Sequence, residues 1–219
     1  MHPIKREIVQ NLIMGSAQRF NQLKPADIES NHFIYYLKQL MAEGLVEKQG
    51  QTYTLTEHGK HMAGRFSLRD LTVRLQPKIV TTPVCIEDDQ VLLYRWRREP
   101  GFGQVSLVNG KLHFGESVVE AGNRELKEKT NLKAQLTHVG TVYIREFQQG
   151  QCNKHLLSHI LSGADVTGDL RATDVGEPFW ADKKELGNLN LLPGTQEILN
   201  CMDQPPVFFR EFTFEGTAT

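Results

Sequence analysis

The first 44 residues carry apolar side chains at helical spacing. Pro3 suits the first turn of a helix, and the apolar residues that follow it recur every three or four positions. A second, shorter helix is expected over 16–25, and a third is expected to begin at Ser30 or Asn31, either of which could cap it, and to end at Gly44. The buried stripe of this third helix is expected to be Ile34, Leu37, Leu40 and Met41.

Beyond Gly44 the spacing changes to strand-like alternation. The segment LVEKQGQTYTLT (45–56) has two alternating runs around Gly50, which predicts a β-hairpin, and 56–66 returns to helical spacing. Further alternating runs predict strands over 71–75, 79–86 and 91–96, with a central strand at 155–161. This change of pattern predicts two domains, 1–70 and 71–219.

Composition and charge narrow the class of protein. A hydrophobic content of 39% with 23% charged residues is typical of globular proteins, and no apolar run approaches the roughly 20 residues that a membrane span needs. The N-terminus lacks the apolar core of a secretory signal, so we expect a cytoplasmic protein without a membrane partner. The net charge of −1 conceals a net of +3 in residues 1–76, which favours a polyanionic partner for the first domain.

Three scattered cysteines do not indicate a disulfide framework. Cys152, His155 and His159 are residue types that bind zinc. The strand expected there does not place all three on one face, because successive side chains of a strand alternate. We therefore interpret them as ordinary strand residues.

The candidate chemistry lies in GKLHFGESVVEAGNRELKEKTNL (110–132). On the expected helix, Glu125, Glu128 and position 129 emerge on one face, while the core-facing stripe is expected to be Val119, Gly122 and Leu126. Clustered carboxylates suit Mg²⁺, which bridges phosphate oxygens and lowers the pKa of a bound water. Position 129, however, is a lysine.

This stretch resembles the box of the Nudix family, G-x5-E-x7-R-E-U-x-E-E-x-G-U, in which U is aliphatic. The matching residues, seven of the nine fixed places, are Gly110, Glu116, Arg124, Glu125, Leu126, Glu128 and Leu132. Lys129 replaces a glutamate, and Asn131 replaces the glycine that ends the helix. The resemblance implies an α/β/α sandwich with a mixed sheet for the second domain, within an α+β chain.

The resemblance also implies roles for these residues. The catalytic set would be Glu125, Glu128, Arg124 and Glu116, the last two orienting the loop and the helix. Members of the family often recruit a further acid from a distant loop, here Glu177 or, as second choice, Glu120, so the metal set would be Glu125, Glu128 and Glu177. Lys129 would pair with Glu125 and leave Mg²⁺ binding weak or absent, while its ammonium could meet a phosphate directly.

A nucleoside-diphosphate-linked small molecule is the ligand that this resemblance implies. The loop 95–104 combines cations with aromatic rings, which suits phosphates and a base. The expected ligand contacts are Arg95, Trp96, Phe102, Gly110 and Lys129. The alternative is that this loop is a solvated hairpin tip.

Residues 1 to about 66 resemble a winged helix-turn-helix domain. The segment FIYYLKQLMAEGLVEK (33–48) is similar to the recognition helix and first wing strand of that family. The resemblance implies DNA as a partner, with contacts from His32, Tyr35, Tyr36, Lys38, Gln39 and Lys48. The modest positive charge implies a homodimer that supplies the remaining affinity. The alternative is a polar helix face that pairs with another protein.

Together these features predict a transcription regulator in which a winged helix binds DNA and a Nudix-like domain binds the small-molecule ligand. The Nudix-like domain is expected to cleave this ligand slowly or not at all. In known Nudix-related regulators the winged helix usually follows the Nudix domain, and here it precedes it. The alternative function is an active Mg²⁺-dependent Nudix hydrolase that cleaves a nucleoside diphosphate derivative. A third possibility is an adaptor that uses neither site.

Overall fold

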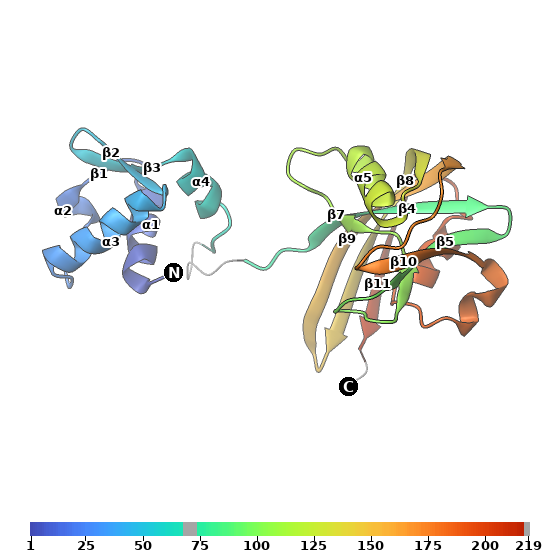
Figure 1. Ribbon diagram of the computed structural model, residues 1–219. Helices are drawn as coiled ribbons and strands as arrows, with labels where there is room; N and C mark the ends of the chain where they lie inside the picture. Colours follow the sequence, from blue (N-terminus) through green and yellow to red (C-terminus); the bar gives the residue numbers. More distant parts are fainter. Residues whose placement is uncertain (68–73, 217–219) are drawn as a thin grey trace. The chain divides into compact units, whose positions relative to one another are not determined.

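The computed structural model describes residues 1–67 and 74–216 and divides the chain into two compact units, Met1–Leu75 and Gln76–Thr219 (Figure 1). The predicted boundary between residues 70 and 71 lies outside the described residues, as do residues 71–73 of the strand expected over 71–75.

The first unit contains helices and a small antiparallel sheet. Its elements are α1 (Pro3–Met14), β1 (Gln18–Arg19), α2 (Phe20–Leu23), α3 (Ser30–Ala42), β2 (Val46–Gln49), β3 (Thr52–Leu55) and α4 (Glu57–Ala63). The sheet has the order β1-β3-β2. The helices and the hairpin predicted from the sequence are confirmed, except that the second helix is only four residues long and follows a short strand.

The core of the first unit lies between α1, α3 and the hairpin. Its fully or nearly fully buried side chains are Ile8, Val9, Leu12, Leu23, Phe33, Leu37, Leu40, Leu45, Val46 and Leu55. The stripe predicted for α3 is wrong at Met41, which is 39% exposed, whereas Phe33 is buried. Phe33 packs edge-on against Phe20 of α2, with ring centroids 5.0 Å apart, and so belongs to the inward side of α3 with Leu37 and Leu40.

The ends of these elements follow from local chemistry. Gly44 ends α3 with a φ of 68°, and Gly50 forms the hairpin turn with a φ of 61°, both values that favour glycine. The predicted capping of α3 by Ser30 or Asn31 is wrong, because its N-cap is Glu29 and no side chain bonds to the helix start. α4 is capped by the Thr56 hydroxyl, which accepts a hydrogen bond from the Gly59 amide.

The second unit is built on a mixed sheet, as predicted. Its elements are β4 (Lys78–Glu87), β5 (Gln90–Trp96), β6 (Val105–Leu107), β7 (Gly110–Lys111), α5 (Val118–Thr130), β8 (Lys133–Gln148), β9 (Gln151–Thr167), β10 (Gly176–Asp182), a 3-10 helix η1 (Lys183–Asn188), α6 (Thr195–Cys201) and β11 (Phe208–Glu215). The sheet has eight strands in the order β10-β5-β4-β9-β8-β11, with β6 paired to β5 and β7 to β4. β4 runs parallel to β9 and β11 parallel to β8, whereas the other pairs are antiparallel.

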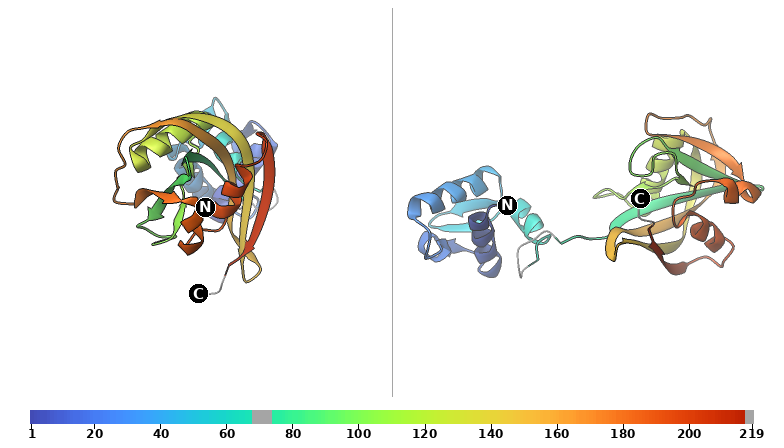
Figure 2. Two further views of the ribbon diagram at one scale, coloured as in Figure 1. Left: turned by 90° about the vertical axis from the view of Figure 1, so that its right-hand side faces the viewer. Right: turned by 90° about the horizontal axis from the view of Figure 1, so that it is seen from below.

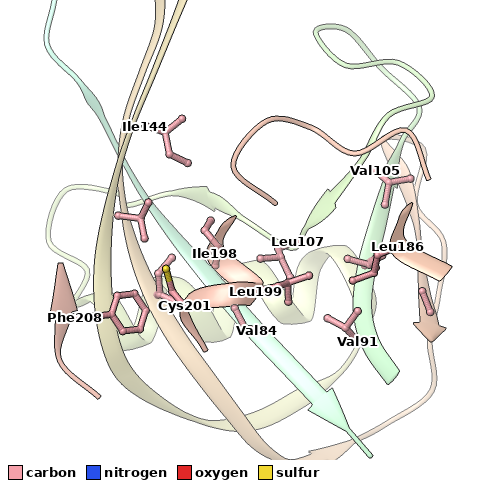
Figure 3. Close-up of a cluster of buried hydrophobic side chains, with 14 residues drawn as sticks. Val84, Val91, Val105, Leu107, Ile144, Leu186, Ile198, Leu199, Cys201 and Phe208 are labelled. Atoms are coloured by element: carbon pink, nitrogen blue, oxygen red, sulfur yellow. The ribbon is translucent and has the colours of Figure 1, made fainter. Parts of the chain in front are cut away.

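Helices cover both faces of this sheet, which curves around the core (Figure 2). On one face, Ile198, Leu199 and Cys201 of α6 pack onto strand residues such as Val84 and Leu107 (Figure 3). On the other face, Leu126 of α5 packs with a second buried cluster that contains Cys85, Leu92, Tyr94, Val108 and Leu132. We call this second face the α5 face of the sheet.

Across the described residues, no helix combines the length and the apolar character that crossing a membrane requires.

Candidate functional site

Helix α5 positions most of the candidate residues. Ser117 and Glu120 form a capping box at its start, since each side chain bonds to the backbone amide of the other. Glu120, the second-choice acid, is therefore engaged at the helix start. At the other end, Asn131 adopts a left-handed φ of 66°, which asparagine tolerates better than most residues. Within the expected core stripe, Gly122 and Leu126 are buried, but Val119 is 37% exposed.

Arg124 ties the loop before α5 to the helix. Its Nε and one terminal nitrogen donate to the two oxygens of Glu116 at 2.6 and 2.9 Å, a bidentate pair. The same terminal nitrogen donates to the carbonyl of Lys111 at 3.0 Å, which binds β7 to the same guanidinium. The predicted pairing of Arg124 with Glu116 is thus confirmed.

The carboxylate of Glu125 is buried and held between two cations. Arg124 donates to its Oε1 at 2.7 Å, and the ammonium of Lys129 lies 2.9 Å from its Oε2. A Cβ added to Gly110 would lie 1.8 Å from the Glu125 Cδ, so the carboxylate rests directly on the backbone of β7. Gly110 is therefore required by the close approach of Glu125.

Lys129 is drawn into the same site. Its side chain is only 12% exposed, and its ammonium also donates to the carbonyl of Asn109 and lies 5.0 Å from the centre of the Trp96 ring. Burial lowers the pKa of Lys129, an effect that its bond to Glu125 opposes. The predicted pairing of Lys129 with Glu125 is confirmed.

A chain of polar contacts extends from this ion pair to Trp96. The indole N–H of Trp96 donates to the Ser106 hydroxyl at 2.9 Å, and the amide of Asn109 donates to the same hydroxyl at 3.4 Å. Arg98 lies 5.7 Å from the centre of the Trp96 ring. Two cations therefore lie near one partly exposed indole, an arrangement that suits an aromatic base and phosphates.

Comparison with known proteins identifies the family of this site. The family model described as NUDIX domain matches residues 76–201, more than half of the chain. The chain belongs to the NUDIX family. Helix α5 and the loop before it are its NUDIX box, and the fold predicted for the second domain is consistent with that of the family.

Individual relatives agree with this assignment. An ADP-ribose pyrophosphatase from Methanocaldococcus jannaschii is 26% identical over 148 residues, which cover 66% of this chain and 83% of the relative. The NUDIX domain of NrtR from Shewanella oneidensis, solved in complex with ADP-ribose, superposes with a TM-score of 0.52 at 14% identity, over 68% of this chain and 97% of that domain. A MutT protein from Bacillus halodurans gives a TM-score of 0.54 at 21% identity, over 63% of this chain and 90% of its own.

The NUDIX box of this chain does not fit a resident Mg²⁺ ion as it is arranged. Both oxygens of Glu125 face cations, while Glu128 is 61% exposed at its side chain and lies 3.5 Å from Arg124. Glu177 is on β10, not on a loop, and accepts a hydrogen bond from Arg97 at 2.9 Å. Within residues 1–67 and 74–216, no three His, Cys, Asp or Glu side chains gather as a metal site would need, so the predicted set of Glu125, Glu128 and Glu177 is not assembled.

The predicted ligand contacts are only partly brought together. Trp96, Gly110 and Lys129 share one site. Arg95 instead stacks on Phe179, which packs with the cluster on the opposite face of the sheet, and Phe102 is 67% exposed. Sequence reasoning missed Arg98, Ser106 and Asn109. Arg98 lies in a bend two residues after the end of β5, so its place beside Trp96 depends on how the chain turns there and not on strand alternation.

The predicted DNA-contact residues lie on α3 and β2 of the first unit. His32, Tyr35, Lys38 and Lys48 are exposed, and Gln39 is half-buried. Tyr36 is half-buried because its ring stacks on His2 with centroids 4.3 Å apart, and its hydroxyl lies 3.0 Å from the His2 Nε2. Tyr36 therefore packs α3 against the residue that precedes α1.

The Arg124 to Glu116 pair makes stability depend on pH. Hydrogen bonds from Arg124 and from the His113 amide lower the pKa of Glu116 to about 2. Because the folded-state pKa lies below the unfolded one, the stabilisation is complete above the ordinary carboxyl pKa and is lost as the pH falls towards about 2. We expect the difference in free energy of unfolding between wild type and Glu116→Gln, measured by urea titration, to shrink over this range. A difference that stays constant down to about pH 2 would contradict this assignment.

Proposed function

We propose that this protein is a transcription regulator whose NUDIX domain binds a nucleoside-diphosphate-linked metabolite and whose first unit is a winged helix-turn-helix domain that binds DNA. The observation that carries the proposal is the ion pair between Lys129 and Glu125. It places an ammonium where the family's box has a metal-binding carboxylate. We infer that the site recognises diphosphates directly and cleaves them slowly or not at all.

The ligand half of the proposal rests on the chemistry around Lys129. Its ammonium and the guanidinium of Arg98 can meet phosphate oxygens, and the Trp96 ring offers a surface for a base. Ion pairing with Glu125 fixes the Lys129 ammonium in place, which reduces the entropy lost on binding. The NrtR domain solved with ADP-ribose and the relative named ADP-ribose pyrophosphatase support ADP-ribose as the first ligand to test.

The DNA half rests on the first unit. Three helices followed by a hairpin are the elements of a winged helix-turn-helix, and the exposed Tyr35 and Lys38 are suited to bases and phosphates of a major groove. A homodimer in the cytoplasm is part of this proposal, because two copies would supply affinity that one weakly basic unit lacks.

Activity is the first test. We expect the wild-type chain to release little or no product from ADP-ribose, nucleotide sugars or nucleoside triphosphates with Mg²⁺ or Mn²⁺, while ADP-ribose binds measurably. Rapid turnover that is abolished by Glu128→Gln would replace the regulator proposal with that of an Mg²⁺-dependent hydrolase. That second function is favoured by the retained Arg124, Glu116, Glu125 and Glu128 and by the name of the Methanocaldococcus relative.

DNA binding is the second test and is independent of the first. Gel-shift titration with the region upstream of the protein's own operon, repeated at rising salt, is expected to show sequence-preferring binding that Tyr35→Ala weakens and ADP-ribose alters. Lys38→Ala is expected to lower affinity for all sequences and to reduce the salt slope by about one. Lys60→Ala on α4, whose side chain already pairs with Glu57, is the matched control. Binding that is indifferent to sequence and to Tyr35→Ala would refute the DNA half.

A further inference from the structure

Three polar side chains outside the NUDIX box converge on the α5 face of the sheet. They are His138 and Thr141 on β8 and His159 on β9. The Nδ1 of His159 lies 3.4 Å from the Nε2 of His138, and the Thr141 hydroxyl lies 3.4 Å from each of these nitrogens. An irregularity in β8 between His138 and Gly140 allows side chains three positions apart to meet on one side of the strand.

The two histidine nitrogens and the Thr141 hydroxyl form a triangle. Its side lengths match the spacing of metal ligands better than the spacing of hydrogen-bonded groups. Ordinary hydrogen bonds between such groups span about 2.7–3.2 Å, so all three separations are long. Three ligands of a tetrahedral ion that are 3.4 Å apart lie about 2.1 Å from the metal, close to the zinc–nitrogen distance of roughly 2.0–2.1 Å. We propose that His138, His159 and Thr141 form a site for a borderline divalent transition metal such as Zn²⁺, with the fourth position open.

The surroundings favour this use. Burial and the neighbouring His138 lower the pKa of His159, a shift in the direction of the neutral imidazole that metals bind. His138 is exposed, so the triangle is reachable from solvent. The third group is a hydroxyl, a weaker ligand than a thiolate or an imidazole, and we therefore expect an exchangeable ion.

Strand register separates this site from the NUDIX box. Thr81 of β4 pairs with Gly110 on one side and with His159 on the other, so His159 lies two strands, roughly 10 Å, from the backbone beneath Glu125. The Thr81 hydroxyl is buried and has no hydrogen-bond partner within the described part of the chain. The register therefore places an unpartnered hydroxyl on the strand residue next to His159.

Co²⁺ and Zn²⁺ are the probes for this site, used with the full-length chain. Tetrahedral Co²⁺ gives a strong visible absorption, and we expect one such ion per chain, displaced by Zn²⁺. His138→Gln and His159→Gln are each expected to weaken binding at least about tenfold, since removal of even an outer partner of a metal ligand typically costs about 10- to 100-fold. Thr141→Val is expected to cause a smaller loss.

His155→Gln is the matched control, because His155 lies on β9 outside the triangle, where its ring packs against Tyr143. It is expected to bind as wild type does. The proposal is overturned if the wild-type chain binds neither ion at about 100 μM, or if binding survives both histidine substitutions and is lost with Cys152→Ser. Should His159→Gln fail to fold by circular dichroism, the exposed His138→Gln decides the question.

Discussion

Lys129→Glu is expected to raise Mg²⁺-dependent hydrolysis of ADP-ribose at least about 100-fold above wild type, because it restores a third carboxylate to the NUDIX box and changes the local charge by two units. The substitution removes the ammonium from the Oε2 of Glu125 and places a carboxylate one helical turn from it. Glu125, Glu128 and the new side chain would then share one face of α5. Product release with and without Mg²⁺ is the measurement.

Stability provides a second measure of the same change. Without a metal, two adjacent carboxylates repel each other, so Lys129→Glu is expected to have a lower melting temperature than wild type and to regain stability when Mg²⁺ is added. Lys133→Glu makes the same charge change just beyond the helix, where the side chain is exposed, and should respond to Mg²⁺ as wild type does. If the two variants behave alike in both measurements, Lys129 is not what limits metal binding.

Gly110→Ala is expected to lower the free energy of unfolding by about 3 kcal/mol, because overpacking costs about 1–3 kcal/mol and the collision also disturbs a buried ion pair. The added Cβ would lie 2.0 Å from both oxygens of Glu125. That carboxylate cannot move aside without lengthening its contacts to Arg124 and Lys129. Urea unfolding measures the loss, and calorimetry with ADP-ribose is expected to show weaker binding in the same variant.

Gly187→Ala is the control for this prediction. Gly187 is in η1, its added Cβ would meet no atom within 4 Å, and its φ is not in the left-handed region. We expect its free energy of unfolding to stay within about 0.5 kcal/mol of wild type. Equal effects of the two substitutions would show that Glu125 does not rest on Gly110.

Most of the fold could be predicted because its signals are local. The helical spacing after Pro3, the alternation around Gly50 and the box from Gly110 to Leu132 each specify an element within a short window. The sequence pattern alone did not predict that α3 buries Phe33 and leaves Met41 exposed. Burial of Phe33 depends on its packing against Phe20, which belongs to another element.

In the candidate site, too, contacts within one element could be predicted from the sequence, and contacts between elements could not. Lys129 and Glu125 are one turn apart on a single helix, so their pairing followed from spacing alone. The contribution of Asn109 depends on how the loop after β6 turns back towards α5. Strand alternation alone separates the neighbours Arg95 and Trp96, but which of the two meets Lys129 depends on which face of β5 the helix covers. Glu177 was assigned to a loop, but it lies in a paired strand beside Arg97. Those outcomes are set by tertiary contacts.

Calorimetric titration of ADP-ribose into the wild-type chain, once in EDTA and once in Mg²⁺, decides whether the NUDIX domain recognises a diphosphate without a metal ion. We expect binding of the same affinity, within about twofold, under both conditions, because the Lys129 and Arg98 cations would take the place of the metal. Binding that appears only with Mg²⁺, accompanied by consumption of the ADP-ribose, would contradict this expectation.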